Sequence, residues 1–304
     1  MLPMTTVFMV VAPILLITGI TILSMGIMYR IREQIIVSIG LLLLGLGFVV
    51  AVLALNKIDE NLMINYGWRY PYVKLLEGGI LNPLKGPISP SFVQLGSWAA
   101  STNYMLAASV LLLLGVVLLS YVGSFMIGLE GAKALILPVV ILVIGLAGVY
   151  YLNTSISLMA KAQDISAALH ARDMSGYLRT AAMLLGFIIV TIGPLFVYFE
   201  TRSKEYLLYS ASYFLMALAW AVASTSFFTV FERRAVFDYI SSGSIGTPLS
   251  MFTAGAVLIV FGSVGLLIAS TVEVVGSALG AAGAEEEFEE LEEEVTEEVA
   301  EEEE

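Results

Sequence analysis

The fold is decided by residues 5–55, which read TTVFMVVAPILLITGITILSMGIM (5–28), YRIREQ (29–34) and IIVSIGLLLLGLGFVVAVLAL (35–55). The first and third parts carry no charged residue, and a helix of about 20 apolar residues crosses roughly 30 Å of hydrocarbon. Each Leu, Ile, Val or Phe favours insertion by about 0.3 to 0.6 kcal/mol, whereas one central Arg costs about 3 kcal/mol. These residues therefore predict a transmembrane hairpin.

The composition indicates that lipid surrounds most of the chain. Of the 304 residues, 59% are hydrophobic and only 13% are charged, which is outside the range of soluble domains. The net charge of -12 comes from the Glu-rich end that starts at Glu285, so the remainder is close to neutral. With no cysteine, disulfides and cysteine-bound zinc or iron–sulfur sites are excluded. Absent Cys and scarce Gln and Asn also favour a thermophilic source.

Basic residues set the expected orientation. Residues 1–6 contain no Lys or Arg, whereas Arg30 and Arg32 follow the first span in a tight turn. The positive-inside rule places that turn in the cytoplasm and the N-terminus outside. The first span is then a retained anchor, because a cleaved signal peptide requires a basic flank and a small-residue cleavage site.

We expect an all-α polytopic integral membrane bundle of about seven transmembrane helices in residues 1–275. Residues 56–97 carry charges and four prolines, so they are expected to form an outer loop, either an interfacial anchor or a lid. Asp173 or Ser175 is expected to cap the fifth span, and the chain to leave the membrane at Glu273. The expected spans are about 5–28, 35–55, 104–126, 134–152, 180–199, 206–228 and 248–271.

Two of the expected cytoplasmic turns resemble each other. RIREQIIVS (30–38) aligns with RSKEYLLYS (202–210). The alignment pairs Glu33 with Glu205, and it pairs Arg30 and Arg32 with Arg202 and Lys204. A parallel repeat of the hairpin, or of a three-helix unit with the fourth span as spacer, would explain the likeness. Convergence is the alternative, because cytoplasmic turns favour basic residues and helix starts favour Glu.

The predicted spans contain little that could carry chemistry. None has an ionisable residue near its middle, which argues against a proton-coupled transporter, a voltage sensor or a charge-ringed channel. His170 is the only histidine, and Asp164 lies six residues before it, on another face from Asp173. We therefore assign no catalytic residue, metal or cofactor, and expect a protein that is not an enzyme. No basic patch for nucleic acid is present.

The acidic end is the most distinctive feature outside the spans. Residues 276–304 form a Gly/Ala-rich hinge and a Glu-rich tail, which the predicted topology places in the cytoplasm. Like charges disfavour a fold in isolation, so the tail either keeps the chain soluble or docks a basic partner. In a helix, its apolar residues would form one stripe. These residues are Phe288, Leu291, Val295 and Val299.

The leading functional hypothesis is a non-catalytic subunit or scaffold of the cell membrane that packs with other membrane proteins and docks a basic cytoplasmic partner through its tail. The alternative is a transporter or pore for a neutral or lipophilic solute, lined by Asn103, Asn153 and Thr154. Residues 153–155 are also expected to form hydrogen bonds between helices. An enzyme acting on lipids ranks last, since no acid–base pair can be named.

Overall fold

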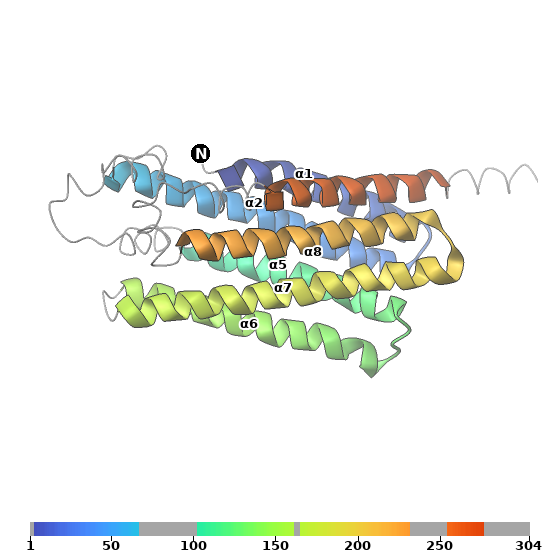
Figure 1. Cartoon of the computed structure of the whole chain (residues 1–304). Helices are drawn as coiled ribbons and strands as arrows, with labels where there is room; N and C mark the ends of the chain where they lie inside the picture. Colours follow the sequence, from blue (N-terminus) through green and yellow to red (C-terminus); the bar gives the residue numbers. More distant parts are fainter. Residues whose placement is uncertain (1–2, 67–101, 161–164, 232–253, 277–304) are drawn as a thin grey trace, which may run out of the picture.

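The computed structural model describes residues 3–66, 102–160, 165–231 and 254–276. Within these ranges the chain is helical throughout and contains no strand, which confirms the expected all-α class. Figure 1 shows the helices side by side in one bundle. They are α1 (Pro3–Met28), α2 (Arg32–Tyr66), α5 (Thr102–Met126), α6 (Ala132–Ala160), α7 (Ile165–Thr201), α8 (Lys204–Phe231) and a last helix, Ala254–Gly276.

Six of the seven described helices are long and apolar enough to cross a membrane. The seventh, α8, is not among these six. It nevertheless packs against α7 along the bundle, in the place expected for the sixth span. The multi-pass helical membrane character is thus supported by the structure.

Several helices are longer than the predicted spans. α2 continues through Tyr66, into the segment expected as a loop, and the last helix continues through Gly276. α7 begins at Ile165, so Asp173 and Ser175 lie inside a helix, and the expectation that either residue caps it was wrong. Residues 165–179 keep the helical pattern, and Asp173 accepts hydrogen bonds from Arg172 instead of capping backbone N–H groups.

The three short turns lie together at one end of the bundle, on the right in Figure 1. They join α1 to α2, α5 to α6 and α7 to α8. Along the cross-section, α1 packs on α2, α2 on α5, and α5 on α6 and α7, while α7 also packs on α6 and α8. Consequently the basic residues of the first and third turns share one face of the protein.

One apolar core runs through the whole bundle. It includes fully buried side chains from α1, α2, α5, α7, α8 and the last helix, with Ile141 from α6. Side chains that point away from this core are large and apolar, as expected of helices that face lipid on their outer surface. The fully buried members include Leu15, Leu44, Phe48, Val116, Phe187, Met216 and Leu266.

The two similar turns share an unusual backbone conformation. Arg30 and Arg202, which the sequence alignment pairs, are the only described non-glycine residues with positive φ, at 56° and 60°. Each ends one helix in the left-handed region, a common way to terminate a helix. The next helix begins two residues later, at Arg32 and at Lys204. Farther along the same alignment, Ser38 and Ser210 are both buried.

The same alignment extends to the glycine contacts of α2 and α8. A methyl group added at Gly115 of α5 would lie 2.8 Å from the carbonyl oxygen of Gly40 and 2.8 Å from Leu44 Cγ, both on α2. A methyl group added at Gly262 of the last helix would lie 2.9 Å from the carbonyl oxygen of Ser212 and 2.7 Å from Met216 Cγ, both on α8. The alignment pairs Gly40 with Ser212 and Leu44 with Met216.

These matching contacts support a parallel repeat of three helices. One unit is α1, α2 and α5; the other is α7, α8 and the last helix. With Gly115 matched to Gly262, the buried Leu119 and Val122 of α5 match the buried Leu266 and Ala269 of the last helix. The units meet where α5 packs on α7, with Gly193 close to Gly123.

We predict that Gly115→Ala and Gly262→Ala destabilise the protein to a similar degree, by roughly 1–3 kcal/mol each, because each added methyl group meets a backbone carbonyl that cannot rotate away. Thermal unfolding of the purified protein in mild detergent measures the effect. Gly276→Ala is the control, because a methyl group there meets nothing within 4 Å. A loss at only one of the two paired positions would contradict the equivalence of the units.

Candidate functional site

A half-buried polar cluster joins the two repeat units near the end that carries the turns. Glu273 of the last helix accepts two hydrogen bonds from different helices, one from Gln34 Nε2 of α2 at 2.8 Å and one from the Tyr209 hydroxyl of α8 at 2.7 Å. The other amide atom of Gln34, Oε1, is buried and has no hydrogen-bond partner. Tyr213, one turn after Tyr209, is also buried.

This junction cluster ties a helix of the first unit to two helices of the second. A carboxylate that accepts hydrogen bonds from an amide and a phenol is held in a fixed position, and such bonds are stronger than those between neutral groups. Among the described residues, no group of three His, Cys, Asp or Glu side chains could hold a metal ion. The cluster can therefore act as an interhelical lock.

A second polar cluster lies toward the opposite end, around Arg179 of α7. Its Nη1 atom donates to Ser109 Oγ of α5 at 2.8 Å, and its Nε atom donates to the carbonyl oxygen of Ser175 at 3.3 Å. The hydroxyl of Ser175 is buried and has no hydrogen-bond partner. The aliphatic part of Arg179 packs over Gly148 of α6. A guanidinium group thus lies where α5, α6 and α7 meet.

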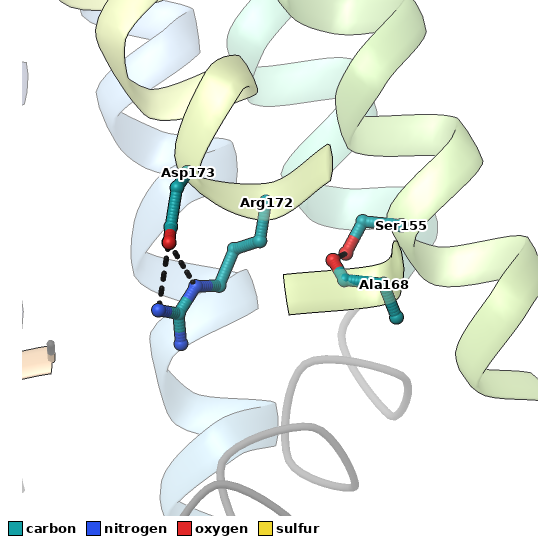
Figure 2. Close-up of polar contacts among 4 residues, drawn as sticks. All are labelled: Ser155, Ala168, Arg172 and Asp173. Carbon is teal, nitrogen blue, oxygen red and sulfur yellow. Dashed lines mark hydrogen bonds and ion pairs between the residues drawn. The ribbon is translucent and has the colours of Figure 1, made fainter. Parts of the chain in front are cut away.

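Figure 2 shows the polar contacts about two to three turns closer to the start of α7 than Arg179. Ser155 Oγ of α6 donates to the carbonyl oxygen of Ala168 at 2.8 Å, which links α6 to α7. Arg172 donates to the Asp173 carboxylate from Nε at 2.9 Å and from Nη2 at 2.7 Å. The charge of Arg172 is therefore balanced within α7.

The predicted turn residues lie at one end of the bundle. Arg30 lies in the first turn, Arg32 and Glu33 begin α2, Arg202 lies in the third turn, and Lys204 and Glu205 begin α8. The Ser203 hydroxyl donates a hydrogen bond to the half-buried Glu205 carboxylate, and this bond holds the pKa of Glu205 below its ordinary value. These residues form a charged rim that suits a membrane surface.

The predicted polar lining does not point into the apolar core. Asn103, at the start of α5, and Asn153 of α6 are exposed, and the Thr154 hydroxyl donates to Tyr150 of its own helix at 3.0 Å. Of residues 153–155, Ser155 makes the expected hydrogen bond between helices. His170 is exposed, and Asp164 lies outside the described residues. The tail stripe of Phe288, Leu291, Val295 and Val299 also lies outside them.

Sequence reasoning missed Glu273 and Arg179 because both lie near the boundaries of predicted spans. Glu273 was expected where the chain leaves the membrane, but it lies inside a helix and bonds to side chains of two others. Arg179 immediately precedes the expected start of the fifth span at 180. A helical wheel that continued before residue 180 would have placed Arg172, Ser175 and Arg179 on one face.

Comparison of the chain with protein-family models, curated proteins and solved structures finds no match.

We predict that Glu273→Ala lowers stability by roughly 1–3 kcal/mol, because it leaves the hydroxyl of the buried Tyr209 and the amide of the half-buried Gln34 without their acceptor. Thermal unfolding in detergent measures this loss. Glu130→Ala is the matched control, because Glu130 is exposed at the same end of the bundle. Glu273→Ala combined with Tyr209→Phe should lose less than the sum of the single changes. Fully additive losses would show that the two residues are not coupled.

Proposed function

We propose that this protein is a non-catalytic membrane subunit, which packs laterally with other membrane proteins and docks a basic cytoplasmic partner through its acidic tail. The observation that supports the scaffold role is the apolar core shared by all seven described helices. Side chains in such an interior are close-packed, and close packing resists deformation. A body of this kind suits a rigid platform.

The shape of the bundle supplies surface for lateral contacts. α1 and α6 lie at opposite edges of the view in Figure 1, and both expose long rows of apolar side chains. On α6 the exposed residues include Ile136, Val139 and Val143. In a membrane such surfaces face lipid or another protein's helices, and packing between helices drives the association.

The junction cluster favours a second candidate, a transporter for a neutral or lipophilic solute. Glu273 and Tyr209 belong to one repeat unit and Gln34 to the other, so breaking these bonds would let the units move relative to each other. Parallel repeats that rock against each other occur in transporters. This candidate requires the buried interior to become accessible to water in one of its states.

Deleting residues 277–304 should abolish capture of the cytoplasmic partner while leaving the membrane body folded, because the deletion removes the acidic tail and none of the described helices. Affinity purification in mild detergent, followed by quantitative mass spectrometry, compares the deleted and full-length proteins. Leu291→Glu with Val295→Glu should weaken capture at least about tenfold if the apolar stripe enters the interface. Glu293→Gln with Glu297→Gln is the control pair, since it keeps the stripe. A solitary full-length protein would contradict the proposal.

The absence of cysteine permits a direct test of sidedness and rigidity with single cysteine substitutions. In intact cells, a membrane-impermeant maleimide should label Asn103→Cys, and should label Lys133→Cys only after lysis, because these exposed positions lie at opposite ends of the bundle. Ser120→Cys should stay unlabelled in both conditions, because Ser120 is fully buried in α5.

Each outcome of the labelling test has one meaning. Labelling of Lys133→Cys before lysis would show that the orientation is the opposite of the predicted one, with the tail outside the cytoplasm. Labelling of Ser120→Cys in the folded protein would show that the interior opens to water, which favours the transporter over the scaffold.

A further inference from the structure

The charge of Arg179 is not balanced by another described residue. No carboxylate of the described residues forms an ion pair with it, and its hydrogen-bond acceptors are the Ser109 hydroxyl and the Ser175 carbonyl oxygen. A guanidinium group has five N–H donors, so most of its donor capacity is unused. Ionisable residues inside membrane-spanning segments are costly and mark functional sites.

The apolar stretch of α7 runs from His170 to Thr201, so Arg179 lies within its first third, on the side toward one membrane surface. The exposed Tyr177 precedes it by two residues, which is about 3 Å along a helix, and the exposed Tyr150 lies on neighbouring α6. Tyrosines favour the layer of lipid headgroups. The bond from Arg179 to Ser175 turns the side chain toward the start of α7, and so toward the same layer.

We propose that Arg179 is the centre of a binding site for a phosphate anion between α5, α6 and α7, and that the phosphate belongs to an anionic phospholipid. Arg is suited to phosphate because its planar fork donates two parallel hydrogen bonds. Arg179 as a residue is half-buried, and Ser109 and Gly148 hold its inner side against α5 and α6, so in this proposal the oxyanion meets the guanidinium group on the side that faces away from these two helices.

The surroundings favour this ligand over a structural role alone. The nearby basic residue Arg172 is already bonded to Asp173, which leaves Arg179 as the uncompensated charge on this face of α7. The buried Ser175 hydroxyl, one turn away on the same face, is a second polar group with unused hydrogen-bonding capacity. The setting of these two polar groups is apolar, since Leu152 and Ile156 of the neighbouring α6 form a buried cluster. Polar groups with unused hydrogen-bonding capacity in such a setting require a polar partner.

Native mass spectrometry of the delipidated full-length protein tests the site with phosphatidylglycerol and phosphatidylcholine in competition. The wild type should retain phosphatidylglycerol at least about fivefold better than phosphatidylcholine, and Arg179→Gln should reduce that preference to within about twofold. Lys133→Gln is the matched control, because it removes one positive charge from the opposite end and should keep the wild-type preference. Arg179→Lys keeps the positive charge but loses the planar guanidinium group, so its preference for phosphatidylglycerol should lie between those of the wild type and Arg179→Gln. This variant tests the site even if Arg179→Gln fails to fold.

A parallel arm adds inorganic phosphate and follows thermal stability. If inorganic phosphate stabilises the wild type but not Arg179→Lys, the anion site is upheld and its source is free phosphate. The proposal is overturned if every Arg179 variant that folds keeps the full preference for phosphatidylglycerol and inorganic phosphate stabilises these variants as much as the wild type. The proposal is also overturned if position 179 cross-links to a copurified membrane protein through a carboxylate, because that carboxylate would then be the partner of Arg179.

Discussion

Close approach of helix backbones is the constraint on which this structure depends. In hydrocarbon the hydrophobic effect does not drive one helix against another, so packing contacts and interhelical hydrogen bonds must hold the bundle together. Gly115 lets α5 reach the backbone of α2 at Gly40, and Gly262 lets the last helix reach α8 at Ser212. Gly123 and Gly193 bring α5 and α7 together in the same way. Larger side chains at these positions would separate the helices and open the core.

A parallel repeat of three helices would account for α6. The first unit, α1, α2 and α5, contains an odd number of helices, so it starts at one end of the bundle and finishes at the other. A second unit can run parallel to the first only if the chain first crosses back. α6 makes that crossing, and it lies at the edge of the bundle against α5 and α7. A parallel repeat of three-helix units thus requires one helix that has no counterpart.

The two polar clusters have different relations to the repeat. The junction cluster of Glu273, Gln34 and Tyr209 ties the units to each other and satisfies its charge with hydrogen bonds. Arg179 lies against α6 and is satisfied only in part, which is why it suits an external anion whereas Glu273 suits an internal lock. Glu273 lies three residues before the end of its span and Arg179 nine residues after the start of its own, and a long side chain lowers the cost of such a charge by reaching toward the polar surface of the membrane.

The sequence by itself determined that the chain is a helical membrane protein, where most of its helices lie, and that the turns at Arg30 and Arg202 resemble each other. These follow from local properties, namely continuous apolar length and the residues that flank it. Only the tertiary structure decided which helices are neighbours, that Asp173 pairs with Arg172 inside α7, and that Gln34 meets Glu273 across the bundle. Apolar helices are nearly alike in composition on every face, so their order in space depends on where glycines permit contact and where single polar groups find partners, and these depend on all helices together.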